Sequence, residues 1–247
     1  MKPKIDQFSK QAVTYKKFRP TYPSNLYGYI LDFVGERKAC WDCGTGNGQV
    51  ASVLAAHFEQ VYATDISQKQ IDQATLHSKI EYSIQSAEQT NFPDQTFDLI
   101  AVAQALHWFD HPAFELEVKR VAKPGAILAT WGYNLLRINP QINALLDYFY
   151  KSTVGPYWHP RRKHVDNSYT DISFDLEPIA VTNEFSITVH WNLDQVQGYF
   201  NSWSSVQNYL IKNPGENPVD QLIADLKPRW KDQQIQFPLF LNLWRVG

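Results

Sequence analysis

The chain of 247 residues contains only two cysteines, Cys40 and Cys43, and both lie in one short segment. A zinc site would need a second pair of ligands nearby, so this C-x-x-C spacing favours two small buried residues over a metal or redox site. Lysine and arginine form no long block, and the net charge is -2. Because nucleic acids and acidic membranes are usually bound by basic surfaces, we expect neither as a partner.

Long apolar runs are also missing. No stretch approaches the roughly 20 apolar residues of a membrane-spanning helix. Lys2, Lys4 and Lys10 are not followed by an apolar segment, which disfavours a secretory signal, so we expect the protein in the cytoplasm. The hydrophobic content of 44% and the charged content of 19% indicate a folded globular protein.

Strand-like and helix-like segments alternate from Lys38 to Trp131. Such alternation predicts an α/β fold, which we expect to be a doubly wound, mostly parallel sheet of seven strands with helices on both faces. Ser67 and Gln70 form a capping-box pattern that predicts a helix after the second strand. Five strands are expected at "KACWDCG", "QVYATD", "IEYSI", "FDLIAVAQ" and "AILATW".

Beyond Trp131 the alternation breaks. Residues 132–178 are rich in aromatic residues, proline, histidine and arginine, and we expect them to form an insertion over the sheet. The later segments "FSITVHW" and "IQFPLFLNLWRV" alternate apolar and polar residues as strands do, and the second is expected to complete the sheet.

The stretch "WDCGTGNG" places Gly44, Gly46 and Gly48 directly after the first predicted strand. Glycine costs backbone entropy, so the cluster indicates a turn where a ligand lies against bare backbone N–H groups. Asp65 ends the second predicted strand, about 20 residues on, where a carboxylate can bind both hydroxyls of a ribose. The D-x-G-x-G-x-G spacing differs from the G-x-G-x-x-G spacing that is typical of dinucleotide-binding proteins. A ribose-binding carboxylate does not by itself require that the ligand is a dinucleotide.

"WDCGTGNG" resembles motif I of the class I S-adenosylmethionine-dependent methyltransferases. "YATDIS", "SAEQTNFPDQTFDLI", "AVAQALHWF" and "RVAKPGAILAT" resemble, in this order, later segments of the same family. The resemblance implies a Rossmann-like methyltransferase fold, S-adenosylmethionine as the cofactor and S-adenosylhomocysteine as its product.

The resemblance also implies roles for single residues. Asp42 would face the ammonium group of the cofactor, Asp65 would bind the ribose, and Ile66 would lie against the adenine. Asp42 could instead shape its own turn, Asp65 could cap the next helix, and Glu88 could be a solvated loop acid. The implied cofactor residues of these segments are Asp42, Gly44, Gly46, Asp65, Ile66, Ala87, Glu88, Ala103 and Gln104, the last two at the methionine part.

The flanking segments "YKKFRPTYP" and "GPYWHPRR" resemble the small-molecule branch that includes trans-aconitate methyltransferase. This implies that Tyr15 and Arg19 contact the carboxylate end of the cofactor, although Arg19 could equally be a surface cation. "WHPRR" lacks the glycine of the branch's pattern, so the aconitate substrate does not carry over.

We accordingly expect one methyltransferase domain over residues 1–247. Residues 1–36 would cover the cofactor, and 37–131 would bind it. Residues 132–180 would form an insertion that caps the substrate, and 181–247 would complete the sheet.

His107 is the candidate catalytic residue. With an unperturbed pKa near 6.5, its imidazole can take a proton from a hydroxyl or amine. The alternative is a histidine that packs beside Trp108. His107 and His111 are four residues apart, but Pro112 breaks the helix that a two-histidine metal site requires, so no metal is expected.

Arg161 and Arg162 lie among aromatic residues of the predicted insertion. Above a cofactor site they could bind a substrate carboxylate with paired hydrogen bonds, whereas the alternative is a solvated basic face. An aromatic face such as that of Trp108 would favour the sulfonium cation. The expected substrate-binding residues are Trp108, Tyr133, Tyr157, Trp158, Arg161 and Arg162.

The predicted activity is in-line transfer of a methyl group to a small-molecule acceptor, at an oxygen of a carboxylate or hydroxyl. A carboxylate acceptor would need no base at neutral pH. The alternatives are a non-catalytic sensor or scaffold that binds the cofactor, a nicotinamide-dependent oxidoreductase, and a methyltransferase acting on nucleic acid or protein. We expect a monomer or a weak dimer.

Overall fold

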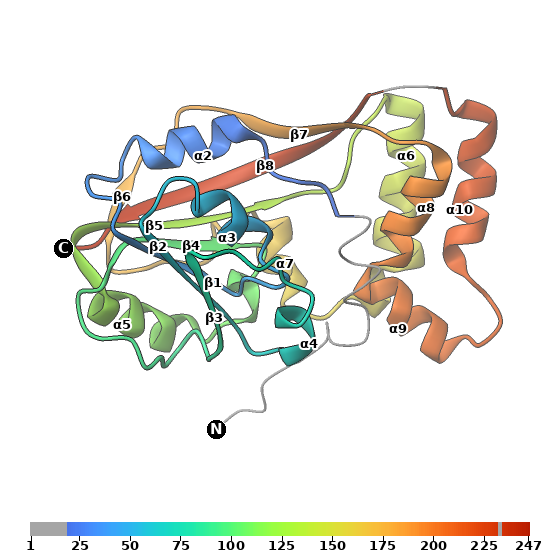
Figure 1. Ribbon diagram of the computed structural model, residues 1–247. Helices are drawn as coiled ribbons and strands as arrows, with labels where there is room; N and C mark the ends of the chain where they lie inside the picture. Colours follow the sequence, from blue (N-terminus) through green and yellow to red (C-terminus); the bar gives the residue numbers. More distant parts are fainter. Residues whose placement is uncertain (1–18, 232–233) are drawn as a thin grey trace.

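The computed structural model describes residues 19–231 and 234–247. Within them, eight strands form one sheet in the order β3-β2-β1-β4-β5-β8-β6, and β7 also pairs with β8 (Figure 1). Neighbouring strands from β1 to β5 pair in parallel, whereas β8 runs antiparallel to β5, β6 and β7. The strands are β1 (Ala39–Cys43), β2 (Gln60–Asp65), β3 (Ile80–Ile84), β4 (Phe97–Ala103), β5 (Ala122–Tyr133), β6 (Glu177–Ile179), β7 (Phe185–His190) and β8 (Gln234–Arg245).

Helices cover both faces of this sheet, so the predicted doubly wound, mostly parallel α/β fold is confirmed. The α-helices are α2 (Ser24–Leu31), α3 (Gln49–Leu54), α4 (Gln68–Ile71), α5 (His111–Val121), α6 (Pro140–Tyr148), α7 (Arg162–Asp166), α8 (Leu193–Asn201), α9 (Ser204–Lys212) and α10 (Pro218–Leu226). Single helical turns occur at η1 (Leu106–Trp108), η2 (Phe149–Thr153, a π-turn), η3 (Gly155–Tyr157) and η4 (Lys227–Arg229).

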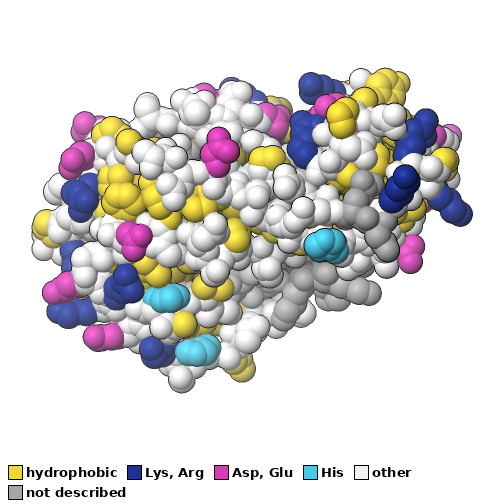
Figure 2. All heavy atoms as spheres, turned by 90° about the horizontal axis from the view of Figure 1, so that it is seen from above, with side chains coloured by type: hydrophobic (Ala, Val, Ile, Leu, Met, Phe, Trp, Pro, Cys, Tyr) yellow, Lys and Arg dark blue, Asp and Glu magenta, His cyan; other side chains and the backbone are white. Residues whose placement is uncertain are grey.

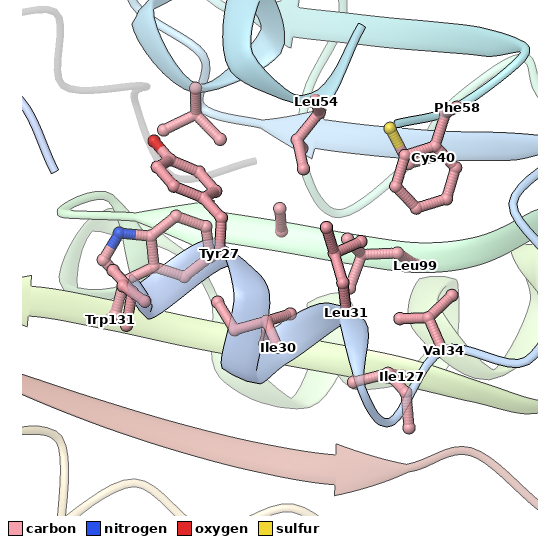
Figure 3. Packing of buried hydrophobic residues seen from close by; sticks show 14 of the residues in the cluster. Tyr27, Ile30, Leu31, Val34, Cys40, Leu54, Phe58, Leu99, Ile127 and Trp131 are labelled. Atoms are coloured by element: carbon pink, nitrogen blue, oxygen red, sulfur yellow. The ribbon is translucent and has the colours of Figure 1, made fainter. Parts of the chain in front are cut away.

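Strand β4 lies at the centre of the core. Because side chains alternate along a strand, Leu99 and Ala101 pack on one face with α2 and α3, while Ile100 and Val102 pack on the other with α5. Figure 3 shows the first of these layers, in which Leu31 of α2 lies beside Leu99. Cys40 and Cys43 are both buried and unpaired, as small core residues.

A second layer of helices lies at one end of the sheet. Helices α6, α8 and α10 stand side by side there, and α9 lies below them (Figure 1). They pack with β7 and β8 around their own apolar cluster, which includes Phe200, Trp203 and Phe237. We call α6, α8, α9 and α10 the cap. It joins chain segments on both sides of β6 and β7.

The helix predicted after Ser67 has only four residues, and the capping box is not formed. The Ser67 side chain makes no cap hydrogen bond. The backbone N–H of Ser67, which a capping box would pair with the Gln70 side chain, instead donates to Asp65 Oδ1 at 2.9 Å. The side chain of Asp65 therefore shapes this turn.

The surface matches the balanced charge of the sequence. On the face that Figure 2 shows, Lys and Arg side chains are interspersed with Asp and Glu. None of the helices in the described ranges is long and apolar enough to cross a membrane.

Asp98 ties three strands together at the edge opposite the carboxyl ends of β1 and β4. Its Oδ2 accepts hydrogen bonds from the backbone N–H groups of Lys38 and Ala39, both at 2.9 Å, and its Oδ1 accepts one from Lys123 Nζ at 2.5 Å. The residue is only 6% exposed. A buried acceptor with this many partners is costly to remove, because its donors lose their bonds without regaining water.

We therefore predict that Asp98→Ala lowers the free energy of unfolding by about 2–4 kcal/mol, measured by urea denaturation. The control is Asp72→Ala, an exposed aspartate whose side chain accepts a hydrogen bond from Gln68, where the loss should stay within about 0.5 kcal/mol. Equal effects of the two substitutions would contradict this role of Asp98.

Candidate active site

A cleft of about 800 Å³ opens at the carboxyl ends of β1, β2 and β4. The strand order changes direction there, with β2 on one side of β1 and β4 on the other, and parallel α/β sheets bind ligands at such points. Every cofactor residue expected from the core segments lines this cleft. They are Asp42, Gly44, Gly46, Asp65, Ile66, Ala87, Glu88, Ala103 and Gln104.

The three glycines after β1 all have positive φ, between 57° and 79°. A Cβ at Gly44 would lie 2.6 Å from the Ala105 Cβ, and one at Gly48 would overlap the Tyr82 hydroxyl. At Gly46 the nearest atom to a Cβ would be Gln70 Oε1, 3.9 Å away. Gly44 and Gly48 thus allow close packing of the turn, while Gly46 leaves its backbone open to the cleft.

Asp42 is 1% exposed at the base of the cleft. Its Oδ2 accepts hydrogen bonds from Thr45 Oγ1 at 2.5 Å and from the N–H of Ala51 at 2.9 Å, so it does shape its own turn. Burial, with a smaller contribution from Asp65, raises the pKa of Asp42 from 3.8 to about 7 despite these two bonds.

Asp65 fixes the turn from the neighbouring strand. Its Oδ2 accepts from the N–H of Gly46 at 2.9 Å, and its Oδ1 accepts from Ser67. Asp65 is half-buried and lines the cleft.

The far side of the cleft is formed after β3. Glu88 accepts hydrogen bonds from the N–H of Asp110, at 3.0 Å, and from the Ser86 hydroxyl. Ile66 is 39% exposed, an apolar side chain open to the cleft. An apolar surface beside carboxylates suits a flat ring with polar edges.

Gln104 directly follows β4 and has a left-handed backbone, at φ 54°. This conformation is costly for a residue with a side chain and often marks a functional site. The Gln104 side chain donates to the carbonyl of Tyr133 at 3.1 Å. Gln104 and Trp108 line both the cleft and a smaller pocket, so the two cavities meet at these side chains.

The smaller pocket, of about 60 Å³, lies between β4, β5 and the cap. Its described lining contains two arginines, Arg19 and Arg162, and no aspartate or glutamate. Its aromatic walls include Tyr133, Trp158 and Tyr199. The complete described lining is Arg19, Gln104, His107, Trp108, Tyr133, Leu135, Trp158, His159, Arg162, Tyr199, Trp203 and Ser204.

Arg162 is held in this pocket from several sides. Its Cζ lies 4.7 Å from the centre of the Trp158 ring, and its Nε donates to the Tyr150 hydroxyl at 2.9 Å. Tyr150 in turn donates to Asp166, whose carboxylate lies 3.5 Å from Arg162 Nε. The side chain of Arg162 is 21% exposed, so the aromatic contact is formed largely away from water.

His107 is 7% exposed at the wall of the smaller pocket. Its Nδ1 lies 3.0 Å from the hydroxyl of Tyr169. Burial, followed by the nearby basic side chains of Arg162, His164, Arg161 and His159, holds the pKa of His107 well below its usual value. The imidazole is therefore neutral at physiological pH.

The structure separates the two neighbouring arginines of the predicted cluster. Arg161 lines the larger cleft, where its Nη1 donates to the carbonyls of Trp108 and Phe109, while Arg162 lines the smaller pocket. Arg19 also lines the smaller pocket, and its Nη1 donates to the Tyr133 hydroxyl at 2.8 Å. Tyr157 lines neither cavity, because its ring packs on Tyr209 of α9.

Tyr15 lies outside the described residues, so its contact with the cofactor stays a prediction. His111 Nε2 donates to the carbonyl of Leu106 at 3.1 Å, and His164 Nδ1 lies 2.9 Å from Asp171 Oδ2. Among the residues for which coordinates are described, no group of three or more His, Cys, Asp or Glu side chains could hold a metal ion.

Sequence reasoning missed the contribution of the cap to the pocket, namely Tyr199, Trp203 and Ser204, and it missed Tyr169 behind His107. The aromatic spacing of "LDQVQGYFNSW" indicates an amphipathic helix, but nothing in it indicates which cavity the helix closes.

Comparison with known proteins agrees with this geometry. A family model of the methyltransferase domain matches residues 41–130. A protein of Dictyostelium discoideum named as a methyltransferase is 34% identical over 249 residues, which cover 96% of this chain and 94% of that protein. A solved structure described as a type II methyltransferase from Anaeromyxobacter dehalogenans has 32% identity and a TM-score of 0.85, and the match covers 93% of this chain and 98% of that one.

The chain belongs to the class I S-adenosylmethionine-dependent methyltransferases. A protein of Saccharomyces cerevisiae named as an S-adenosylmethionine-dependent methyltransferase is also similar, with 22% identity over 96% of this chain and 94% of that protein. Membership of this enzyme family decides against the nicotinamide-dependent and sensor interpretations. In this methyltransferase the larger cleft has the position and lining expected for the cofactor.

The pKa of Asp42 predicts how the stability of this methyltransferase depends on pH. Between pH 3.8 and about 7, folded Asp42 keeps its proton while the unfolded chain has lost it. Stability from this group is therefore complete below pH 3.8 and decreases as the pH rises toward 7. Relative to Asp42→Asn, the wild-type free energy of unfolding should fall by up to about 1.4 kcal/mol per pH unit in this window. Urea denaturation at a series of pH values measures it, and parallel curves for the two proteins would show the interpretation to be wrong.

Proposed function

We propose that this enzyme holds S-adenosylmethionine in the larger cleft and transfers its methyl group to an oxygen of a small organic anion in the smaller pocket. The observation that carries the proposal is the junction of the two cavities at Gln104 and Trp108. A group bound on each side of this junction would be within reach of the other. The acceptor oxygen would belong to a carboxylate or a hydroxyl.

The residues of the cleft fit the proposed cofactor. Asp65 offers carboxylate oxygens for ribose hydroxyls, Ile66 offers an apolar surface for adenine, and Glu88 offers a carboxylate for the adenine amine. Gly46 leaves the backbone open where a side chain would otherwise project. Asp42 lies at the base of the cleft. Once Asp42 loses its proton near pH 7, its carboxylate would place a negative charge near the ammonium group of the cofactor.

Bound S-adenosylmethionine would supply an electrophilic methyl group. The protein's own residues then have to align the acceptor and exclude water. Trp108 lines the passage between the two cavities, and the face of its aromatic ring would stabilise the positive charge on sulfur. Gln104, held to the Tyr133 carbonyl, fixes one edge of this passage.

The charge of the smaller pocket indicates the acceptor class. Its described lining carries two arginines and no acidic side chain, so an anion is favoured over an amine. A guanidinium such as that of Arg162 can bind a carboxylate with two parallel hydrogen bonds. A volume of about 60 Å³ restricts the part of the acceptor that enters to a few atoms.

The cofactor site is tested with Ile66→Ala, which removes an apolar contact and none of the hydrogen bonds that shape the turn. Binding of S-adenosylhomocysteine, measured by calorimetry, should weaken by about 5- to 30-fold, the cost of losing a few buried CH₂-sized groups. Leu76→Ala is the matched control, because Leu76 is 90% exposed and does not line the cleft. Unchanged affinity in Ile66→Ala would show that the adenine does not lie against Ile66.

The acceptor site is tested by a methyl-transfer assay with a panel of small carboxylic acids, phenols and amines. We expect turnover of acids or hydroxy acids. Arg162→Met should lower kcat/KM for them by about 10- to 150-fold, the range for a hydrogen bond to a charged group.

The affinity for S-adenosylhomocysteine should not change in Arg162→Met, because Arg162 does not line the cleft. Lys163→Met, an exposed cation on the same helix, is the control and should leave both values unchanged. Turnover of amines alone, or equal effects of the two substitutions, would contradict an anionic acceptor bound by Arg162.

A further inference from the structure

Tyr169 is a buried tyrosine whose side chain contacts His107. The residue is 1% exposed, and its hydroxyl lies 3.0 Å from His107 Nδ1. The two rings are inclined by 29°, with their centres 6.2 Å apart. On its other side, the Tyr169 ring packs edge-on against Phe240 of β8, at 5.0 Å. The tyrosine therefore lies between the sheet and the histidine.

The backbone that carries Tyr169 is in an unfavourable conformation. Ser168 and Tyr169 both have positive φ, 53° and 61°, although neither is glycine. Left-handed backbone costs roughly 1–2 kcal/mol for each such residue. Asn134 Nδ2 donates to Ser168 Oγ and Asn242 Nδ2 donates to the Ser168 carbonyl, so a residue just after β5 and a residue of β8 hold this turn. The strained turn places the tyrosine hydroxyl at the histidine.

Burial and the neighbouring basic side chains oppose protonation of His107. Arg161, Arg162, His159 and His164 lie on the segment that runs over it, and the ring itself is buried. A neutral imidazole has one nitrogen that donates and one that accepts, and the hydrogen bond at one nitrogen decides the role of the other. Tyr169 therefore determines what His107 offers to the pocket.

We propose that the Tyr169 hydroxyl donates to Nδ1 of His107 and so fixes the tautomer that carries its proton on Nε2. A phenol is a better donor than a neutral imidazole N–H, and an imidazole nitrogen is a better acceptor than a phenol oxygen, since the phenol has a pKa near 10 and the imidazole is the stronger base. Tyr169 is then a positioning residue. His107 is a neutral hydrogen-bond donor toward the acceptor, in place of the general base that the sequence suggests.

This assignment rests on the proposed function in one respect, because the group that accepts the hydrogen bond from Nε2–H is the anionic acceptor proposed above. Together with Arg19 and Arg162, the N–H would give the pocket a third donor for an anionic oxygen. Transfer to a carboxylate forms an oxygen–carbon bond and breaks the sulfur–carbon bond, with the electron pair of the broken bond left on sulfur. No proton is released, so the step needs no base.

The tautomer is measured directly by ¹⁵N NMR on protein labelled at histidine, without acceptor or cofactor. His107→Gln assigns the signal. We expect His107 to remain neutral with its proton on Nε2 across the pH range in which the protein is folded near neutrality. A wild-type signal with the proton on Nδ1 would overturn the proposal and restore the general-base role.

Tyr169→Phe removes only the hydroxyl and keeps the buried ring. The Nδ1 signal should then lose the shift produced by a bound donor, and the two tautomers should mix. Tyr148→Phe is the matched control, because Tyr148 is 68% exposed, and it should leave the His107 signal unchanged. An unchanged signal in Tyr169→Phe would overturn the role of Tyr169. Because this readout needs no methyl transfer, its failure is distinct from a failure of the proposed function.

Discussion

The whole site depends on the close approach of two backbones, the turn after β1 and the loop after β4. Gly44 has no room for a Cβ against Ala105, so the absence of a side chain sets the distance between the two segments. This contact holds the glycine turn at the crevice between β1 and β4. The open backbone at Gly46 then faces the cleft, with Asp65 bound to its N–H from the neighbouring strand. A bulkier residue at position 44 would therefore move the turn after β1 away from the loop after β4, and with it the larger cleft away from the smaller pocket.

The two halves of the site are built differently. The larger cleft is formed by short turns that directly follow parallel strands, and its acids already hold backbone N–H groups near those turns. The smaller pocket is assembled from β5, the segment with Arg162 and the helices of the cap. It is lined by aromatic rings and cations, with the neutral His107 in its wall. Burying arginine is costly in general, and here the ring of Trp158 and the hydroxyl of Tyr150 compensate for lost water.

Backbone strain in the described residues is concentrated where the larger cleft meets the smaller pocket. Gln104 and the pair Ser168–Tyr169 are three of the four non-glycine residues with positive φ within the described ranges. Gln104 lines both cavities, and Tyr169 bonds the histidine of the smaller one. Such conformations persist only where surrounding contacts hold them, which agrees with the hydrogen bonds to Ser168 and to the Tyr133 carbonyl.

The sequence by itself determined the parallel sheet and the residues that line the larger cleft. This is because parallel strands end at one edge, so residues just after β1, β2 and β4 must converge. Only the tertiary structure decided the lining of the smaller pocket. Arg161 and Arg162 are neighbours in the chain, yet one faces the cleft and the other the pocket, since a one-residue step at the start of a helix turns a side chain by about 100°. Tyr169 reaches His107 across 62 positions of sequence, and no local pattern encodes such a contact.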